Sequence, residues 1–469
     1  MTNTTIINDT IAAPATAIGG AGIGIIRISG SEAVTITAQL FPAITQMKSH
    51  TIRYGFLIDG TEIIDEVMVT LMKAPHSYTR EDVVEINCHG GSLMMQHILR
   101  HILECGARLA EPGEFSKRAF LNGRLDLSQA DAVMDIIGAR NEAALKLALN
   151  QLRGALSAAV SKLRADILRQ VAYIEAALDD PEHYDLDGYG AQLSEQTQGF
   201  IERIAGLLES ADQGRIIKEG IDCAIIGKPN VGKSSLYNLL LGEERAIVTD
   251  IAGTTRDTLS ESAMVGRLML NLMDTAGIRA TADKIEQLGV ERSIKSADEA
   301  QLVIFMLDLS RDIDDTDRHI ARQLGMKKLI ILLNKADLAR KATEKDIGDI
   351  VDRLCPHGEK TGDGPPVLIC STKDRRGMDE LRDSINEMFL HDGLANVADI
   401  HISNIRHIEA LTQAHTSMCL VRQGLSEKMP EDVLCVDLMD AYESLGTIIG
   451  ERVGDDLVNE IFSNFCLGK

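Results

Sequence analysis

Hydrophobic positions follow two different patterns along this 469-residue chain. Between Asp222 and Cys370, short apolar runs end in glycine or polar residues, a pattern typical of buried strands in a parallel sheet. From Leu145 to Leu178, apolar residues recur at three- and four-residue spacings and predict one long amphipathic helix. Pro181 ends that helix, because proline disfavours helix at the preceding residue. Helical patterning resumes beyond about Leu390, whereas the N-terminal quarter mixes short β-type runs with turns.

These patterns predict a fold of mixed α/β and α class. We expect an α+β domain at residues 1–126, a helical domain in two parts at 127–216 and 391–469, and an α/β domain at 217–390. Because helix flanks the α/β segment on both sides, one helical domain with an inserted α/β domain is the economical interpretation. Two separate helical domains also fit the sequence.

The composition, with 45% hydrophobic and 25% charged residues, is that of a globular protein. No apolar run approaches the roughly 20 residues that span a membrane, and the first residues lack the basic start of a secretory signal. We therefore expect a cytoplasmic protein with no membrane partner. The eight cysteines are scattered, which indicates neither a disulfide framework nor a zinc site. The net charge of −22 argues against a large nucleic-acid surface of the chain's own, since phosphate contacts need lysine and arginine.

The stretch Gly227-Lys-Pro-Asn-Val-Gly-Lys-Ser234 carries the most specific chemistry. The apolar run Cys223 to Ile226 precedes it and a helical run follows, which is the context of a G-x-x-x-x-G-K-S phosphate loop. Its glycines let successive backbone N–H groups turn toward one anion, and the helix N-terminus adds partial positive charge. We expect Lys233 to reach the β- and γ-phosphates of a nucleotide and the Ser234 hydroxyl to bind Mg²⁺.

Three later motifs, each following an apolar run, predict which nucleotide binds. Asp274-Thr-Ala-Gly277 places a carboxylate where it can hold the Mg²⁺ shell and an N–H where it can meet the γ-phosphate. Asn334-Lys-Ala-Asp337 presents an aspartate that accepts hydrogen bonds from the N1–H and the amine of guanine, which adenine does not offer. Ser371-Thr-Lys373 fits the loop that closes over guanine. The sequence therefore predicts a phosphate-loop, Ras-like α/β domain that binds GTP.

A switch loop is expected between the phosphate loop and Asp274, where Gly253-Thr-Thr-Arg-Asp257 lies. Thr254 or Thr255 can offer oxygen to Mg²⁺, although a solvated polar loop is the plain alternative. Ile278 occupies the position at which Ras-like GTPases carry a water-orienting glutamine. Either hydrolysis is slow or another group positions the water.

A second glycine-containing stretch, Cys88-His-Gly-Gly91, follows a short predicted strand that carries Glu85. A histidine beside tight glycines is more often a hydrogen-bonded core residue than a catalyst. We therefore expect His89 to be buried.

Together with further strings along nearly the whole chain, these motifs resemble the MnmE (also TrmE) family of tRNA-modifying GTPases. The further strings are Asp9-Thr-Ile11, Gly24-Ile-Ile-Arg-Ile-Ser-Gly30, Glu81-Asp-Val83, His89-Gly-Gly91, Pro112-Gly-Glu-Phe-Ser116, Arg118-Ala-Phe-Leu-Asn122, Leu125-Asp-Leu127 and the C-terminal Phe465-Cys-Leu-Gly-Lys469. Few families place a GTPase between such flanks and end in Cys-x-Gly-Lys.

The resemblance implies that the N-terminal domain dimerises and binds a one-carbon donor, 5-formyl- or methylene-tetrahydrofolate. Arg27 and Glu85 match the family's folate-contacting residues, and Arg124 stands where many members carry lysine, which keeps the charge but alters the geometry. The loop from Ala17 to Gly22 lacks a basic residue that is common in the family. Cys466 matches a family cysteine and is either a nucleophile, a residue that closes the folate pocket, or part of a packed tail.

The resemblance also implies how the attacking water is handled without glutamine. Members of the family use K⁺, which here would be bound by Asn230 and by the backbone at about Thr249 to Thr255 when two GTPase domains meet. Such a cation takes the role of an arginine finger. Glu286 stands where the family carries a water-orienting glutamate, and a solvated helix residue is the alternative. Arg256 and Arg279 are expected to be secondary switch residues.

By this resemblance we expect a homodimeric, K⁺-stimulated GTPase that acts on the wobble uridine of tRNA. Its FAD-dependent partner MnmG (GidA) would join it in installing a carboxymethylaminomethyl or aminomethyl group at C5. A GTP-dependent ribosome-assembly or RNA-binding switch is one alternative, and a stand-alone folate enzyme with a regulatory GTPase is another. The expected site residues are, for the nucleotide, Asn230, Val231, Gly232, Lys233, Ser234, Ser235, Thr249, Thr254, Thr255, Asp274, Thr275, Ala276, Gly277, Asn334, Lys335, Asp337, Ser371 and Thr372; for folate, Arg27, Glu85, Arg124 and Lys469; for metal ions, Ser234, Thr255, Asn230, Thr249, Ile251 and Thr254; and for catalysis, Lys233, Glu286, Asn230 and Cys466.

Overall fold

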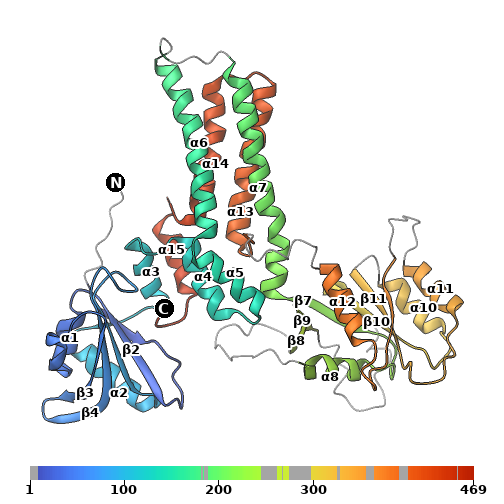
Figure 1. Ribbon diagram of the computed structural model, residues 1–469, viewed down its shortest axis with the longest axis horizontal. Helices are drawn as coiled ribbons and strands as arrows, with labels where there is room; N and C mark the ends of the chain where they lie inside the picture. The colour runs from blue at the N-terminus through green and yellow to red at the C-terminus, as the bar shows by residue number, and fades with distance from the viewer. Residues whose placement is uncertain are drawn as a thin grey trace. The chain divides into compact units, whose positions relative to one another are not determined.

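The computed structural model describes residues 9–180, 183, 188–243, 261–266, 268–273, 297–324, 328–354, 364–389, 400–451 and 453–469. The chain divides into two compact units, whose elements are labelled in Figure 1. Unit 1 comprises Met1–Met134, Gln151–Phe200 and Gln413–Lys469, and unit 2 comprises Asp135–Asn150 and Ile201–Thr412. Each unit is therefore built from stretches that are far apart in the sequence.

Unit 1 contains a six-stranded sheet in the order β3-β4-β5-β2-β1-β6. Neighbouring strands are antiparallel except for the parallel pair β1 and β6. Successive side chains of a strand point to opposite faces, and apolar ones on one face, such as Ile26, Val69 and Ile86, are fully buried in a core that includes residues of two helices. The elements are β1 (Ile11–Pro14), β2 (Ile23–Ser29), α1 (Ala33–Leu40), the 3₁₀ turn η1 (Pro42–Gln46), β3 (Thr51–Asp59), β4 (Glu62–Met72), β5 (Val83–His89), α2 (Ser92–Glu104) and β6 (Arg108–Leu109).

The remaining helices of unit 1 pack through apolar stripes. Helices α6 (Ala155–Asp179) and α14 (Glu431–Ile449) run side by side (Figure 1). Arg164 of α6 is buried between them, where it donates to the Tyr442 carbonyl oxygen at 3.0 Å. Helix α15 (Asp455–Ser463) contacts α3 (Glu114–Leu121), which brings the C-terminal part of the chain to the N-terminal sheet. The apolar core of α6 is Leu156, Val160, Leu163, Ile167, Val171 and Ile174.

The single long helix predicted from the leucine spacing is wrong, because the chain forms two helices there, α5 (Glu142–Leu152) and α6. Gly154 between them has φ +87°, a left-handed conformation that interrupts a helix and that glycine adopts without strain. Leu145 and Leu149 are each 37% exposed, so they do not extend the buried stripe of α6. The end of α6 at Asp179 agrees with the position of Pro181 in the sequence.

Unit 2 contains a second six-stranded sheet, in the order β12-β11-β10-β7-β9-β8, which is parallel except for the pair β8 and β9. Strands β10 and β11 are buried almost throughout, as expected for strands covered on both faces. Helices α8 and α12 contribute to the core on one face, and α10 and α11 to the core on the other. The elements are β7 (Ile221–Ile226), α8 (Lys233–Glu243), β8 (Glu261–Val265), β9 (Leu268–Leu272), β10 (Leu302–Asp308), α10 (Asp315–Gln323), β11 (Lys328–Asn334), α11 (Glu344–Leu354), β12 (Val367–Ile369) and α12 (Met378–Phe389).

Helix flanks the second sheet on both sides in the sequence. Helix α7 (Tyr189–Glu219) precedes β7, and α13 (Ile405–Ser426) follows α12 among the described elements. Helix α4 (Leu127–Gly138) begins where the helical character was expected to begin. The predicted mixed α/β and α fold class is confirmed, while the three domain boundaries stay a prediction. Within the described part of the chain, every helix is too short or too polar to cross a membrane.

Candidate functional site

The phosphate loop follows β7 and owes its shape to three residues with positive φ. Gly227 has φ +150°, Asn230 has φ +63° and Gly232 has φ +111°. A Cβ atom on Gly232 would collide with the side-chain nitrogen of Asn334, and one on Gly227 would press on the Met306 carbonyl oxygen. Only glycine satisfies both the backbone angle and the space at these two positions. Gly227 and Gly232 therefore permit the turned shape of the loop.

Lys233 is a half-buried cation whose partners are carbonyl oxygens. Its Nζ donates to the carbonyl oxygens of Gly227 at 2.6 Å and Lys228 at 2.8 Å. Burial lowers the pKa of Lys233 to about 8, because a charged ammonium is poorly solvated there. No carboxylate among the described residues pairs with it. A cation held this way favours an incoming anion, so the residues of the loop fit a nucleotide phosphate.

The second lysine of the loop, Lys228, is arranged in the opposite way. Its Nζ lies 2.6 Å from Asp314 Oδ2 and 2.8 Å from Asp317 Oδ2, at the N-terminus of α10. Burial would lower the pKa of Lys228, but hydrogen bonds to these two carboxylates raise it overall. Of the two lysines, Lys233 is thus the one available to an anion.

Asn334, at the end of β11, joins the phosphate loop to the predicted base loop. Its Nδ2 donates to the Val231 carbonyl oxygen at 2.7 Å and to Thr372 Oγ1 at 3.2 Å, while its Oδ1 accepts from the Thr372 N–H at 3.0 Å. The residue is 1% exposed. Three of the expected residues, Val231, Asn334 and Thr372, are therefore joined by hydrogen bonds, and Gly232 lies close against the Asn334 side chain.

Asp337 lies at the other end of the same motif and is oriented by the base loop. Ser371 Oγ donates to its Oδ1 at 2.9 Å, and Lys373 Nζ lies 3.9 Å from its Oδ2. The carboxylate is 15% exposed, so it still faces solvent and can accept further hydrogen bonds. These contacts hold a carboxylate beside the loop that was expected to close over guanine.

Lys335 of the same motif pairs with a different carboxylate and has φ +66°. Its Nζ lies 2.6 Å from Asp308 Oδ2 at the end of β10. Burial alone would raise the pKa of Asp308, but hydrogen bonds from Lys335 and Ser310 lower it overall. The pair therefore joins the C-terminal ends of β10 and β11.

Ser234 and Ser235, in the first turn of α8, are exposed. The remaining expected nucleotide, metal and switch residues lie outside the described residues. They are Thr249, Ile251, Thr254, Thr255, Arg256, Asp274, Thr275, Ala276, Gly277, Ile278, Arg279 and Glu286.

A second polar site lies on the sheet of unit 1, where Arg27 of β2 stands directly opposite Glu85 of β5. Arg27 Nε donates to Glu85 Oε1 at 2.9 Å, and Arg27 Nη2 lies 2.8 Å from the same oxygen. The guanidinium carbon also lies 5.5 Å from the centre of the Tyr78 ring and 5.6 Å from that of Phe115. Arg27 is thus held by a salt bridge and by two aromatic faces.

The C-terminal tail reaches this site from the other end of the chain. Arg27 Nη1 donates to the Gly468 carbonyl oxygen at 3.1 Å, and the Phe115 N–H donates to the Lys469 carbonyl oxygen at 3.1 Å. Burial, and then the nearby Arg27, lowers the pKa of Lys469. Cys466 is half-buried, and its carbonyl oxygen accepts from the Gly113 N–H at 3.3 Å. Arg27, Glu85, Cys466 and Lys469, which the family resemblance implied to lie at one site, are therefore neighbours.

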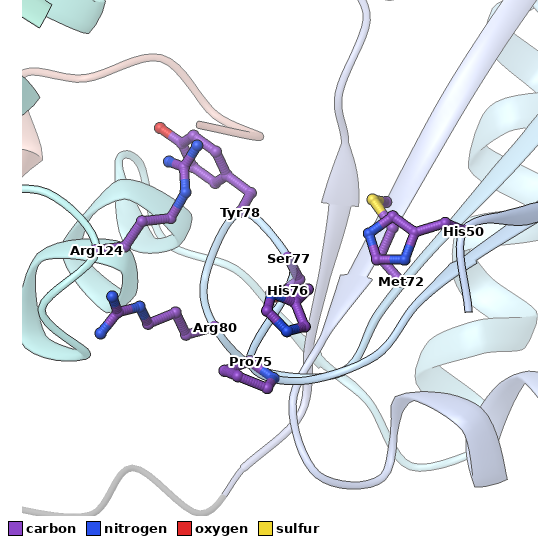
Figure 2. Close-up of a pocket in the computed structure, with 8 residues that line it drawn as sticks. All are labelled: His50, Met72, Pro75, His76, Ser77, Tyr78, Arg80 and Arg124. Atoms are coloured by element: carbon purple, nitrogen blue, oxygen red, sulfur yellow. The ribbon is translucent and has the colours of Figure 1, made fainter. Parts of the chain in front are cut away.

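Tyr78 is the residue of this site that the sequence reasoning missed. The guanidinium carbons of Arg27 and Arg124 both lie near its ring, that of Arg124 at 4.7 Å from the ring centre, and its hydroxyl lies 2.8 Å from Ser116 Oγ. Figure 2 shows Arg124 against Tyr78 at one side of an open pocket of about 530 Å³. The available signal was the position of an aromatic residue, rare in a chain with 3% aromatics, just before the string Glu81-Asp-Val83.

His89 corrects a second expectation, since its side chain is 66% exposed rather than buried. Its Nδ1 lies 2.6 Å from Oδ1 of Asp65, which is 7% exposed, and its backbone N–H donates to Asp65 Oδ2 at 3.0 Å. The residue inside the protein is therefore the carboxylate. It pins the imidazole at the end of β5 with the rest of the ring in solvent.

The three-layer α/β unit, its phosphate loop and the Asn334–Asp337 motif define a phosphate-loop GTPase. Two family models match the chain, one described as the MnmE helical domain over residues 127–466 and one as the GTP-binding protein TrmE N-terminus over residues 10–124. The tRNA modification GTPase MnmE of Lachnoclostridium phytofermentans is 48% identical, covering 98% of this chain and 99% of its own. That of Lactiplantibacillus plantarum is 45% identical, covering 99% of this chain and 100% of its own. The chain belongs to the MnmE family, and it is an enzyme that hydrolyses GTP.

Proposed function

We propose that this GTPase couples GTP hydrolysis to modification of the wobble uridine of tRNA at C5. The observation that carries the proposal is the full-length match to relatives called tRNA modification GTPases, together with the contacts that Lys233, Asn334 and Asp337 make at the candidate nucleotide site. The FAD-dependent protein MnmG would act as the partner in installing an aminomethyl-type group. With a net charge of −22, the chain leaves much of the tRNA-binding surface to that partner.

Four segments share the work in this proposal. Residues 1–126 bind folate and dimerise, 127–216 and 391–469 form the helical domain, and 217–390 bind and hydrolyse GTP. The proposal is supported by the sheet that lies in each of the two α/β segments and by the helices before and after the second sheet.

In the nucleotide site, the residues have separable tasks. Lys233 would leave its two carbonyl partners to contact the phosphates, and Asp337 would accept hydrogen bonds from the guanine edge. Mg²⁺ would be held by the Ser234 hydroxyl and would neutralise phosphate charge when bound. K⁺ would be held in part by Asn230, which is exposed at φ +63°, and would stabilise charge on the transferring phosphoryl group.

In the N-terminal site, the donor set fits a folate. The Arg27–Glu85 pair offers both donors and acceptors to a pterin edge, and the flat faces beside it suit an aromatic ring. When bound, the folate would supply the one-carbon unit. Cys466 and Lys469 would close one side of the site.

The proposal is tested by mass spectrometry of tRNA nucleosides from a strain that lacks this protein. We expect the modified wobble uridine to disappear, to return with the wild-type chain, and to stay absent with Lys233→Met. An unchanged nucleoside profile in the deletion strain would instead support a ribosome-assembly or RNA-binding switch.

The cation has a separate kinetic test. Replacing K⁺ by Na⁺ should slow GTP hydrolysis by about tenfold or more, since one electrostatic contact at a developing charge contributes on that scale. Asn230→Ala should remove the difference between the two salts. Equal rates of the wild-type enzyme in both salts would eliminate K⁺ from the mechanism.

A further inference from the structure

The pocket beside Tyr78 is lined by basic, polar and apolar side chains and by no acidic one. Figure 2 shows Arg124 and Arg80 on one side, His50 on the other and His76 between them. Such a lining is unusual in a chain that carries 70 acidic and 48 basic residues. The lining residues are His50, Met72, Pro75, His76, Ser77, Tyr78, Arg80 and Arg124.

The carboxylates nearest in sequence to this pocket are bonded elsewhere. Glu81 accepts from Arg118 and Ser29, Asp82 accepts from the Ala74 N–H, and Glu85 pairs with Arg27. Among the described residues, neither of the two pocket arginines has a carboxylate partner. Two cations facing one hollow without a counter-charge favour an anionic ligand with more than one negative group.

Backbone strain coincides with the same hollow. His50 has φ +62° and Arg80 has φ +60°, a conformation that glycine would adopt freely. Six described residues other than glycine have positive φ, and two of the other four, Asn230 and Lys335, belong to the nucleotide-site motifs. Such strain clusters where side chains are needed for binding. Arg80 thus places a long cationic side chain at a backbone angle that glycine would adopt with less strain.

The pocket and the Arg27–Glu85 site share the Tyr78 ring. Arg27 and Arg124 lie 5.5 Å and 4.7 Å from the centre of the Tyr78 ring. Arg80 Nη1 donates to the Asn122 carbonyl oxygen at 3.0 Å, which places its guanidinium beside the turn that carries Arg124. A ligand whose ring occupies the first site can therefore extend a charged chain into the second.

We propose that this pocket binds the carboxylates of the folate's glutamate tail, and that the enzyme consequently selects folates with several glutamates over those with one. This inference rests on the proposed folate function of the neighbouring site. Each added glutamate adds one negative charge, which the tail can bring to Arg80, Arg124 and the two histidines. An RNA backbone fits less well, because its phosphates need an extended basic surface rather than a local hollow.

The test compares binding of tetrahydrofolate carrying one or three glutamates to the full-length protein by calorimetry at two salt concentrations. The wild type should bind the triglutamate about tenfold more tightly at low salt, and the preference should shrink as salt screens the charges. Arg80→Gly, whose backbone angle glycine accepts, and Arg80→Gln should both reduce the ratio of the two affinities toward one. Arg375→Gly is the matched control, because Arg375 is also exposed at φ +60° but lies in unit 2, and it should keep the wild-type ratio.

The possible results distinguish a failure of this inference from a failure of the proposed folate function. If neither folate binds, the proposed folate function itself is overturned. Equal affinities for the two folates, or an unchanged ratio in both Arg80 variants with unchanged melting temperatures, would overturn the tail pocket alone. Competition by a tRNA anticodon stem-loop that is lost in Arg80→Gln would assign the pocket to RNA and also overturn it.

Discussion

The two sites of this protein treat positive charge in opposite ways. In the nucleotide site, the partners of Lys233 among the described residues are carbonyl oxygens, and burial depresses its pKa. In the N-terminal site, Arg27 is paired with Glu85 and lies against Tyr78 and Phe115. The first arrangement attracts a highly charged anion, whereas the second is balanced and favours directional hydrogen bonds to a flat ring.

The sites also differ in how the chain assembles them. The phosphate loop is one continuous stretch whose shape depends on Gly227 and Gly232, so its chemistry can be recognised from spacing alone. The N-terminal site gathers Arg27, Glu85 and the carbonyl oxygen of Gly468, which is 441 residues from Arg27 in the sequence. The function of a continuous motif can be recognised in the sequence, whereas the contacts of a site that the fold assembles are visible only in the structure.

The largest effect that would sharpen this comparison is expected for Lys233→Met. It should lower kcat/KM for GTP hydrolysis by about 10²–10³-fold, since it removes a preorganised donor to the phosphates. Lys228→Met is the matched control, because Lys228 is already bound to Asp314 and Asp317. Steady-state kinetics measure kcat/KM of both variants. An equal decrease in the two variants would refute the distinction between the lysines.

The next effect concerns the base. Asp337→Asn should weaken GTP binding by about 10–100-fold, since hydrogen bonds to a charged group contribute roughly 1.5–3 kcal/mol, and it should improve binding of xanthosine triphosphate, whose C2 oxygen accepts from an amide. Ser371→Ala, which removes only the orienting bond at 2.9 Å, should weaken GTP binding by about fivefold. Competition titrations measure both. Unchanged GTP affinity in Asp337→Asn would mean that the carboxylate does not read the base.

A smaller effect is expected in the N-terminal site from Gly468→Ala. Gly468 has φ +89°, and a Cβ there would collide with the Pro14 carbonyl oxygen. The strain, about 1–3 kcal/mol, should displace the tail and weaken folate binding about tenfold. GTP hydrolysis by the isolated protein should stay at the wild-type rate.

Gly454→Ala is the control for this substitution, because Gly454 has φ −68° and nothing within 4 Å of its Cβ position. Hydrogen exchange at the Phe115 N–H, which donates to Lys469, reports the tail directly. Equally fast exchange in both variants, or wild-type folate affinity in Gly468→Ala, would show that the tail does not complete the site.

The smallest effect is a pH dependence of opposite sign for stability and binding. The pKa of Lys233 is about 8 in the folded protein and 10.5 in its unperturbed state, so the unfolded chain binds more protons between these values. The contribution of this group to the free energy of unfolding therefore rises with pH from about 8 to 10.5. GTP affinity should instead fall by a few-fold from pH 8 to 9, since phosphate binding needs the charged form.

Titrations of a non-hydrolysable GTP analogue from pH 7 to 9.5 measure this trend. Lys228→Met should show the same decline as the wild type. A flat profile in the wild type would mean that Lys233 keeps its proton throughout and that the loop does not depress its pKa.

Much of the second sheet could be predicted because its strands are continuous apolar runs. The runs that begin at Cys223, Leu268, Leu329 and Val367 all lie in strands, with the nucleotide motifs at their ends. The break at Gly154 was missed because leucine spacing continues across it, and a glycine in a helical pattern does not reveal its φ.

Contacts between distant residues were the harder part of the site. Nothing in the string around Tyr78 shows that its ring receives both Arg27 and Arg124. Likewise, a buried Asp65 cannot be inferred from Cys88-His-Gly-Gly91, so His89 was expected in the core. Packing between residues far apart in the sequence determines both the contacts of Tyr78 and the exposure of His89, and local sequence patterns do not reveal such packing.

The side chain of Asn334 has a consequence for how the enzyme can respond to its nucleotide. Because one carboxamide bonds Val231 and Thr372 at once, the phosphate end and the base end of the pocket are held at a set separation. The Asn334 side chain therefore couples the position of the phosphate loop to that of the base loop.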